Sequence, residues 1–267
     1  MPSSLGPAAT TRFLDAPVPI AFAHRGYAPD GGENSMAAFA AAVALGYRYL
    51  ETDARVSADG VAIAFHDARL DRVTDGHGVV ARRPWRELAR ARIGGREPIP
   101  RLVDVLAAWP DVFVNVDVKS DAAVAATVAA IRRAGAGDRV CLAAFNDARL
   151  GRLRSLLGPG VCTSAGPTEV AWTKAVSRAG PRAAGRLRGG VAARCLQVPP
   201  RLGRLGLVDR RLIDTAHAAG LAVHVWTVNE RAEMIRLLDL GVDGLMSDRA
   251  DGLRRVLQSR GQWPPER

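Results

Sequence analysis

Short runs of β-branched and other apolar residues alternate with segments of helical period along almost the whole chain, and this alternation constrains the fold most strongly. The runs predict strands at residues 20–24, 48–54, 112–118, 139–144, 160–164, 195–198, 222–227 and 244–247. The segments between them predict helices near residues 35–45, 101–108, 121–134, 147–156, 168–178, 209–219, 230–240 and 250–258. Strands separated by helices are typical of a parallel sheet, in which each helix is the crossover connection.

Eight strands is the number that closes a TIM (β/α)8 barrel, and we expect this α/β fold. An open, doubly wound sheet is the alternative. It is less favoured because no predicted strand is followed by the glycine-rich turn G-x-G-x-x-G. With 267 residues, of which 48% are hydrophobic, the chain can bury a core of barrel size. We expect a single domain at residues 19–258 between flexible tails at residues 1–18 and 259–267.

One segment interrupts the alternation. Residues 50–67, LETDARVSADGVAIAFHD, contain two strand-like runs separated only by SADG. Four residues are too few for a parallel crossover, so residues 53–66 should form an antiparallel hairpin after the second strand. A turn centred between Ala58 and Asp59 would pair residues whose numbers sum to 117. This register predicts that His66 lies opposite Glu51.

Cysteine usage and hydropathy argue for a soluble protein of the cytoplasm. Cys141, Cys162 and Cys195 lie far apart inside apolar runs, which favours buried thiols in a reducing compartment over a disulfide framework. No uninterrupted apolar run approaches the roughly 18 residues of a membrane span. The first residues also lack the basic start and the apolar segment of a secretory signal.

The formal net charge of +10 comes almost entirely from arginine, because only Lys119 and Lys174 among the 37 basic residues are lysines. Such a bias is typical of genome-wide base composition, so a solvated basic surface is one interpretation. The other is attraction of anionic substrates or peripheral contact with anionic lipid, with the basic residues 178–194 as a lip that gathers head groups. Few aromatic residues interleave the basic stretches, so we expect no nucleic-acid partner. The sequence leaves the oligomeric state open.

Two predicted strands carry acidic residues near their carboxyl ends. Residues two apart share a face of a strand, so Glu51 points the same way as Asp53, and Asp117 the same way as Lys119. Unpaired carboxylates are costly to bury, and three that converge from two strand ends suit a divalent cation with oxygen ligands, Ca²⁺ or Mg²⁺. For any single acid the alternative is a structural ion pair, for example between Asp117 and Lys119.

Two histidines, His24 and His66, each end an apolar run. A single histidine there is more often a hydrogen-bonded core residue. Two at one end of a barrel indicate acid–base chemistry, because imidazole titrates near neutral pH. Arg25 offers a planar fork for a phosphate, and Lys119 offers a point charge. Phe145, at the end of CLAAF, either floors the resulting pocket or only packs against its neighbours.

An ordered set of motifs resembles the glycerophosphodiester phosphodiesterase family from about residue 20 to residue 257. The set comprises His24-Arg25-Gly26, Glu33-Asn34-Ser35, Glu51-Thr52-Asp53, His66-Asp67 and Asp117-Val118-Lys119, with VWTVN at 225–229 and GVDGLMSD at 241–248. The resemblance implies a TIM barrel. The connection between Asp67 and Pro100 is too short for a separate large domain, so we expect a loop with one or two short helices there.

The resemblance further implies a role for each side chain of the site. It assigns acid–base catalysis to His24 and His66, one divalent cation (Ca²⁺ or Mg²⁺) to Glu51, Asp53 and Asp117, the phosphate to Arg25 and Lys119, the edge of the site to Glu33, and the pocket wall to Trp226. The family usually carries a glutamate where this chain has Asp117. The carboxylate is therefore one methylene shorter here, which leaves the choice between Ca²⁺ and Mg²⁺ open.

On this resemblance we expect a metal-dependent enzyme that hydrolyses small glycerophosphodiesters to glycerol 3-phosphate and an alcohol. A glycerol hydroxyl can attack the phosphorus internally, so the expected route forms a cyclic phosphate that water then opens; direct attack by water is the alternative. Two other functions stay open. A lysophospholipase D on the same barrel would need a longer apolar wall beside the phosphate site. A catalytically silent barrel would only bind phosphorylated ligands.

Overall fold

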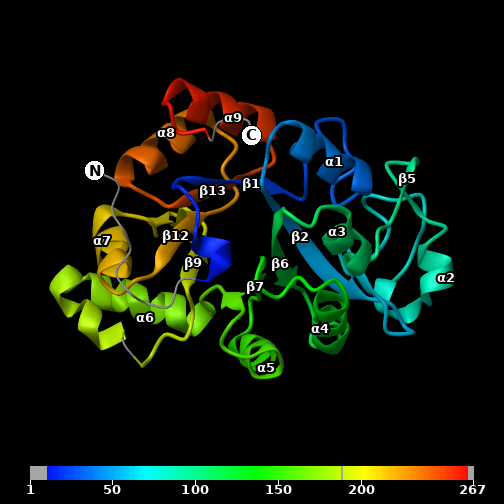
Figure 1. Cartoon of the computed structure of the whole chain (residues 1–267), viewed down its shortest axis with the longest axis horizontal. Coiled ribbons are helices and arrows are strands. Elements are labelled where there is room, and N and C mark those ends of the chain that lie inside the picture. The colour runs from blue at the N-terminus through cyan, green and yellow to red at the C-terminus, as the bar shows by residue number, and fades with distance from the viewer. Residues whose placement is uncertain (1–10, 188, 264–267) are drawn as a thin grey trace.

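Eight parallel strands form the centre of the molecule in the computed structural model, which describes residues 11–187 and 189–263 (Figure 1). The strands are β1 (Ile20–His24), β2 (Tyr49–Val56), β6 (Phe113–Val118), β7 (Val140–Ala143), β8 (Cys162–Thr163), β9 (Cys195–Val198), β12 (Ala222–Val225) and β13 (Gly244–Ser247). They are hydrogen-bonded in the order β8-β7-β6-β2-β1-β13-β12-β9. An isolated parallel bridge between Ser164 and Cys195 joins the two end strands and nearly closes the ring. The prediction of a TIM barrel is confirmed.

Helices surround the strands, as Figure 1 shows. They are α1 (Met36–Ala44), α3 (Leu102–Ala108), α4 (Ala123–Arg133), α5 (Asp147–Leu157), α6 (Pro167–Ser177), α7 (Arg210–Ala218), α8 (Arg231–Leu240) and α9 (Ala250–Ser259), each within a few residues of its predicted range. The smaller elements are η1 (Arg12–Leu14), η2 (Val80–Arg82), α2 (Trp85–Leu88), η3 (Pro181–Leu187), and the two-stranded hairpins β4 (Arg92–Ile93) with β5 (Glu97–Pro98) and β10 (Arg201–Leu202) with β11 (Leu205–Gly206). The connection between Asp67 and Pro100 is therefore a loop with two short helices, as predicted, and it also contains the β4–β5 hairpin.

The hairpin after β2 forms, but its predicted register is wrong by one residue. The strand β3 (Ala62–Ala64) runs antiparallel to β2, and the observed pairs, such as Ala54 with Ala64, sum to 118. The turn has three loop residues, 58–60, because the amide of Ser57 donates to the carbonyl of Val61. Gly60, with a φ of +82°, fits the left-handed position of such a loop.

The corrected register places His66 beyond the paired part of the hairpin, so it does not lie opposite Glu51. The hairpin still returns to the level of the acids, because the amide of Phe65 donates to the carbonyl of Asp53 over 2.9 Å. The next residue along the chain is His66. The hairpin therefore brings the His66 imidazole to the level of the acids through the hydrogen bond of Phe65, whereas His66 itself pairs with no residue of β2.

The expected boundaries of both terminal tails are wrong, because residues on each side pack into the domain. Phe13 of η1 is fully buried, and its carbonyl accepts a hydrogen bond from the Tyr49 hydroxyl over 2.8 Å. Its ring also lies edge-on to Tyr49, with the centroids 5.3 Å apart. At the other terminus the ring of Trp263 lies 5.0 Å from that of Tyr47. The rest of the expected tails, residues 1–10 and 264–267, lies outside the described residues.

We expect Phe13→Ala to lower the free energy of unfolding by about 3–5 kcal/mol, because it removes a fully buried aromatic ring and leaves a cavity. Denaturant unfolding measures the change. Leu156→Ala is the control, since Leu156 is 45% exposed, and it should cost less than about 1 kcal/mol. Equal stability of the two variants would show that η1 contributes nothing to the core.

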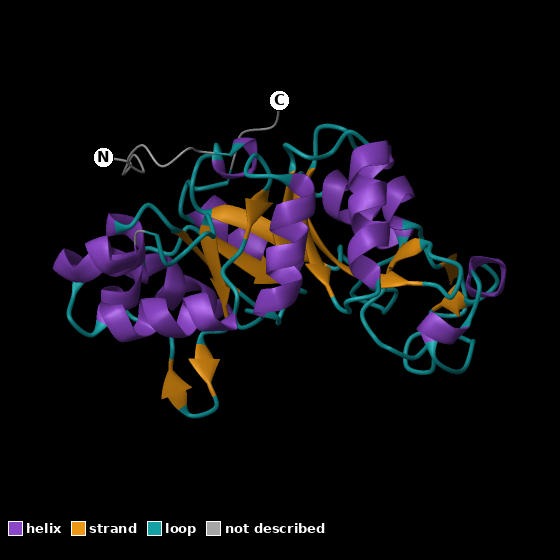
Figure 2. Cartoon of the chain, turned by 90° about the horizontal axis from the view of Figure 1, so that it is seen from below, coloured by secondary structure: helices purple, strands orange, loops and turns teal. Residues whose placement is uncertain are grey.

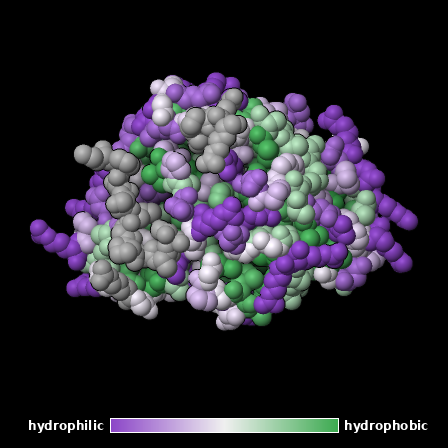
Figure 3. Space-filling view, viewed as in Figure 1, coloured by the Kyte–Doolittle hydropathy of each residue, from purple (hydrophilic) through white to green (hydrophobic). Residues whose placement is uncertain are grey.

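The state of the cysteines and the character of the surface follow what the sequence predicts. Cys141, Cys162 and Cys195 are buried and free of disulfides, as predicted. On the face seen in Figure 3, hydrophilic residues stand out along most of the outline. Within the described part of the chain, no helix combines the length and the apolar character that crossing a bilayer requires. The cytoplasmic location and the single-domain organisation stay predictions.

Candidate active site

A single cavity of about 790 Å³ gathers nine of the ten residues that the sequence singled out. It is lined by His24, Arg25, Glu51, Asp53, His66, Asp117, Lys119, Phe145 and Trp226. Most of these residues lie at or just beyond the carboxyl ends of barrel strands, which is where active sites of TIM barrels are found, whereas Glu51 and Asp53 lie within β2, which continues into the hairpin. The tenth residue, Glu33, does not line the cavity and instead pairs with Arg25 and Arg72.

A sharp turn after β1 places the first histidine and the arginine. His24 is the last residue of β1, and the next two residues have positive φ angles, 56° at Arg25 and 86° at Gly26. A Cβ atom at Gly26 would lie 2.7 Å from the backbone of Ala38, so only glycine allows α1 to approach this closely. The turn directs the amide of Arg25 to the Glu51 carboxylate, with 3.1 Å between Arg25 N and Glu51 Oε2.

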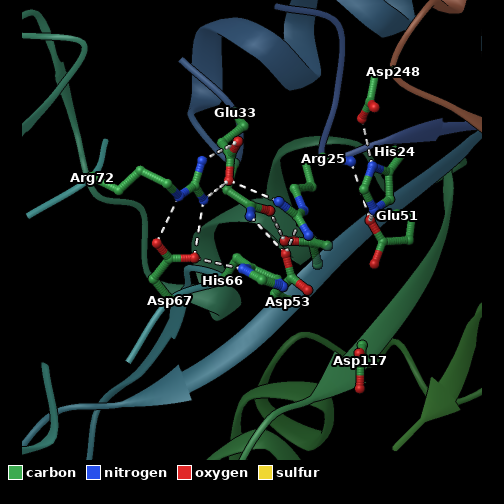
Figure 4. A network of polar contacts seen from close by, with 12 residues as sticks. His24, Arg25, Glu33, Glu51, Asp53, His66, Asp67, Arg72, Asp117 and Asp248 are labelled. Atoms are coloured by element: carbon green, nitrogen blue, oxygen red, sulfur yellow. Dashed lines mark hydrogen bonds and ion pairs between the residues drawn. The ribbon is translucent and has the colours of Figure 1, made fainter. Parts of the chain in front are cut away.

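His24 lies between two carboxylates (Figure 4). Its Nδ1 is 2.6 Å from Oδ1 of Asp248, and its Nε2 is 3.6 Å from Oε2 of Glu51. Burial alone would lower the pKa of His24, but Glu51 and Asp248 outweigh it and the pKa is raised. Asn229 donates to the other oxygen of Asp248 over 2.8 Å and fixes its orientation. Sequence reasoning missed Asp248 as a site residue, although an acid that directly follows the predicted strand 244–247 indicates a position at the carboxyl end of the barrel.

A chain of charged side chains joins His66 to the opposite side of the site, as the dashed lines in Figure 4 mark. Nδ1 of His66 is 2.6 Å from Asp67, and Arg72 bridges Asp67 and Glu33 at 2.7 Å from each. Glu33 then contacts Nη1 of Arg25 at 2.9 Å. The Arg72 hydrogen bond holds the pKa of Asp67 well below its usual range. Because Asp67 occupies Nδ1, the ring nitrogen of His66 that is left for another partner is Nε2.

Asp53 is the most enclosed acid of the site. It is 1% exposed, and its carboxylate lies 3.0 Å from Nε of Arg25 and 2.7 Å from Nζ of Lys119. Burial would raise the pKa of Asp53, but Lys119 and Arg25 outweigh it and the pKa is lowered. Asn34 donates to the same carboxylate over 2.9 Å. Asp53 is therefore an ionised acceptor at the centre of the network.

Asn34 and Ser35 precede α1, and both residue types are common at the N-cap of a helix. Ser35 is the cap, because its hydroxyl accepts the amide of Ala38 over 3.1 Å. Asn34 has a φ of 60° and turns inward, where its amide oxygen accepts a hydrogen bond from Thr52. Its position within Glu33-Asn34-Ser35 was the available signal for a role in the site.

Glu51 and Asp117 are buried acids whose negative charge is poorly compensated. Burial raises the pKa of Glu51 to about 7. Burial also raises the pKa of Asp117, although Lys119 opposes it from 2.6 Å. Oδ1 of Asp117 is buried and, within the described residues, has no hydrogen-bond partner. Asp53 and Asp117 are register partners on β2 and β6, so their side chains rise from adjacent strands at the same level.

Carboxylate oxygens are the ligands that a hard divalent cation prefers, and the site supplies three buried carboxylates. The three acids do not each place an oxygen within 4.8 Å of the other two, so their side chains would have to move closer to share one ion. Arg25 and Lys119 lie beside these carboxylates. The ammonium of Lys119 lies against both Asp53 and Asp117, at 2.7 Å and 2.6 Å, so it neutralises part of that charge. The unpartnered oxygen of Asp117 and the raised pKa of Glu51 are the features that a cation would relieve.

Two aromatic residues form the rim of the cavity. The rings of Phe145 and Trp226 meet edge to face with their centroids 5.5 Å apart, and Nζ of Lys119 lies 5.9 Å from the Phe145 centroid. Phe145 is 64% exposed, so it does not floor the pocket. Phe145 therefore stands beside Lys119, with Trp226 against its other side at the rim.

An apolar groove continues the cavity away from the charged residues, and sequence reasoning missed it. Its walls are one face of α6, with Val170, Ala171 and Ala175, and the β10–β11 hairpin with the residue that follows it, with Leu202, Leu205 and Leu207. The ammonium of Lys174 on α6 donates to the carbonyl of Leu207 over 2.8 Å and ties the two walls together. Among the described residues of the basic stretch 178–194, only Arg178 lines the cavity, so the expected lip is not formed by this stretch.

An eight-stranded barrel that holds two imidazoles, buried acids and two cations at the carboxyl ends of its strands defines a barrel hydrolase for phosphate esters. Comparison with known proteins narrows this class. The Glycerophosphoryl diester phosphodiesterase family matches residues 24–252. The chain therefore belongs to the glycerophosphoryl diester phosphodiesterase family and is a phosphoric diester hydrolase.

Individual relatives agree with this membership. The chain is 42% identical over 260 residues to "Probable glycerophosphodiester phosphodiesterase 2" of Mycobacterium tuberculosis, which covers 97% of this chain and 98% of that protein. It is 26% identical over 277 residues to human "Lysophospholipase D GDPD1", covering 88% and 85% of the two chains. An Oleispira antarctica phosphodiesterase, solved in complex with the product sn-glycerol-3-phosphate, superimposes with a TM-score of 0.74 at 24% identity over 90% of this chain and 97% of that one.

Proposed function

We propose that the protein hydrolyses glycerophosphodiesters to glycerol 3-phosphate and an alcohol, with His24 and His66 as the acid–base pair and a divalent cation on Glu51, Asp53 and Asp117. The observation that carries this proposal is that both imidazoles and all three carboxylates line one cavity with Arg25 and Lys119. The product bound to the Oleispira antarctica phosphodiesterase, which shares the fold, supports glycerol 3-phosphate as the phosphorylated product.

The chemistry follows from the charges in the cavity. A phosphodiester anion repels a nucleophile, and Arg25 and Lys119 would stabilise the charge that builds on the phosphoryl oxygens. A divalent cation supplies further stabilisation of that charge when bound. One histidine takes the proton of the attacking glycerol hydroxyl, and the other protonates the oxygen of the departing alcohol. The attacking glycerol oxygen forms its bond to phosphorus as the bond between phosphorus and the alcohol oxygen breaks, and the product is a cyclic phosphate.

Water then opens the cyclic phosphate with the two histidines in exchanged roles. The residue that accepted a proton returns it to the glycerol oxygen, and its partner takes a proton from water, so both imidazoles end in their starting states. Asp248 and Asp67 are positioning residues in this route, because each holds the Nδ1 side of one imidazole at 2.6 Å. The Nε2 atom of each ring is then the one that would exchange a proton with the oxygens of the diester.

A hydrolysis panel tests the proposal. Glycerophosphocholine, glycerophosphoethanolamine and glycerophosphoglycerol are offered with Ca²⁺, with Mg²⁺ and with a chelator, and glycerol 3-phosphate is measured. We expect turnover with at least one cation and loss of turnover with the chelator. Full activity in the chelator would contradict the role of the three carboxylates. Lack of turnover of every diester would instead favour the silent barrel.

A second candidate activity, that of a lysophospholipase D, is favoured by the apolar groove. A lysophospholipid has the same glycerophosphodiester head and one acyl chain, and the groove between α6 and the β10–β11 hairpin offers an apolar wall for that chain. The sequence similarity to human Lysophospholipase D GDPD1 points in the same direction.

We expect the double variant Ala171→Glu/Ala175→Glu to lower the kcat/KM for lysophosphatidylcholine, relative to that for glycerophosphocholine, at least tenfold. Both alanines are exposed on the groove face of α6, one helical turn apart, so two carboxylates there would repel an acyl chain. The control is Ala125→Glu/Ala129→Glu, an exposed pair with the same spacing on α4. An unchanged ratio in the α6 variant would remove the acyl chain from the groove.

A further inference from the structure

Exposed apolar side chains gather at the mouth of the cavity. Six large hydrophobic residues are exposed in the described part of the chain, and three of them, Phe145, Leu202 and Leu205, line this one cavity. Leu202 is 58% exposed and Leu205 is 77% exposed, the latter more than any other large hydrophobic residue described. Single exposed leucines are ordinary, whereas a group at the rim of a binding site indicates an interaction surface.

The β10–β11 hairpin presents the two leucines together. Leu202 and Leu205 are direct partners across the hairpin, so their side chains stand side by side on one face. Gly203 has a φ of +58°, which the first position of a two-residue turn of this kind requires. In Figure 2 the hairpin extends well clear of the body of the molecule. The most exposed leucines therefore sit at the tip of a projecting element.

The same hairpin carries positive charge and no acid. Arg201 and Arg204 are exposed and flank the two leucines, and residues 201–208 contain neither aspartate nor glutamate. Arg204 has no ion pair with another described residue, whereas Arg201 lies near enough to Glu233 of α8 to lower the pKa of that carboxyl, which is lowered mainly by its hydrogen bond with Arg236. A pair of apolar side chains beside two exposed cations matches a bilayer surface, where acyl chains lie beneath anionic phosphates.

We propose that the β10–β11 hairpin docks the mouth of the active site on a bilayer that contains anionic phospholipid. Leu202 and Leu205 enter the acyl region, and Arg201 and Arg204 contact lipid phosphates. The inference rests on the proposed function, because docking lets a lipid-derived diester pass from the bilayer into the groove. Pairing of two copies through their hairpins fits the tip less well, because it would bring four arginines together without an acid.

Sedimentation with vesicles tests the proposal on the full chain without substrate. One set of vesicles contains equal parts of phosphatidylglycerol and phosphatidylcholine, and the other contains phosphatidylcholine alone. We expect binding to the anionic set that weakens with salt. Leu202→Ser/Leu205→Ser should lower the partition coefficient at least tenfold, whereas Leu156→Ser, at a leucine 45% exposed on α5, should not.

The arginines are tested separately. Arg201→Gln/Arg204→Gln should lower binding by about fivefold for each charge removed. The control is Arg86→Gln/Arg90→Gln, which removes the same charge from two exposed residues at and after α2, and it should have a smaller effect. Equal loss in both arginine variants would show that only net charge matters.

Three results would overturn the docking proposal. They are equal binding of the wild type and the leucine variant, equal loss in the two arginine variants, and absence of vesicle binding by a dimer that the leucine variant dissociates. Because the vesicles carry no substrate, failure of diester hydrolysis leaves the binding result intact. Hydrolysis of diesters without vesicle binding would reject the docking surface and keep the proposed function.

Discussion

Replacing His24 with alanine is expected to lower kcat/KM for glycerophosphocholine by about 10²–10⁴-fold, the usual contribution of a general acid or base. His66→Ala should have an effect of the same size. The double variant should lose little more than either single one, because the two imidazoles act together in the same bond-breaking step. Hydrolysis is measured with saturating cation, and thermal unfolding confirms that each variant folds.

His77→Ala is the matched control, since the His77 side chain is 80% exposed in a loop outside the cavity. A glycerophosphodiester with a p-nitrophenyl leaving group separates the two roles. This leaving group needs no protonation, so it should restore most of the activity in the variant that lacks the general acid of the first step. Near-native rates of both single variants with glycerophosphocholine would contradict the acid–base assignment.

Glu51→Gln is expected to abolish the stabilisation by Ca²⁺ or Mg²⁺ and to lower kcat/KM at least about 10²-fold, because it removes a charged ligand while keeping the shape of the side chain. Thermal unfolding with and without the cation measures the first effect. Glu87→Gln on α2 is the control, since its carboxylate pairs only with Arg83 among the described residues. A cation-dependent shift equal to that of the wild type would exclude Glu51 as a ligand.

The same variant should behave differently in a chelator. Burial raises the pKa of Glu51 from 4.5 to about 7, so the folded chain binds more protons than the unfolded chain between these values. The stability that this group contributes therefore falls as the pH rises from 4.5 to 7. Glutamine has no such proton, so the unfolding free energy of Glu51→Gln relative to the wild type should increase across this window. A constant difference would show that folding does not raise the pKa of Glu51.

The sequence predicts most of the barrel because each strand and helix carries its own local signal. Apolar runs mark the strands, and α1 lies between residue types that favour helix ends, with Ser35 at its N-cap and Gly46 just beyond its C-cap. The hairpin register was less accessible, since it depends on whether the loop has an even or an odd number of residues. Only the left-handed conformation of Gly60 decides this, and the letters SADG allow both.

The acids on the barrel strands can be predicted from the sequence, whereas the residues that hold the histidines and Glu33 in place cannot. Asp117 lies one position before the end of β6 and is the register partner of Asp53 on β2, so the topology of the barrel brings the two acids together. Asp248 contacts His24 from 224 positions away, and Arg72 reaches Glu33 from a loop without a predicted structure. Long side chains on loops find partners through tertiary packing, which local patterns do not encode.

The apolar groove is the part that sequence reasoning could not reach. The β10–β11 hairpin has only two residues in each strand, too few for an alternating pattern to appear. The groove face of α6 is made of small side chains, such as Ala171 and Ala175, that are equally typical of a surface helix. Only the position of the hairpin beside α6 makes these residues a wall.

Diffraction from crystals soaked with Mn²⁺ and sn-glycerol 3-phosphate tests the central claim most directly, because anomalous scattering locates the metal and density locates the phosphate. We predict one metal within ligand distance of Glu51, Asp53 and Asp117, and a phosphate within hydrogen-bond reach of Arg25, Lys119 and both imidazoles. A metal held elsewhere, or a phosphate remote from His24 and His66, would contradict the account.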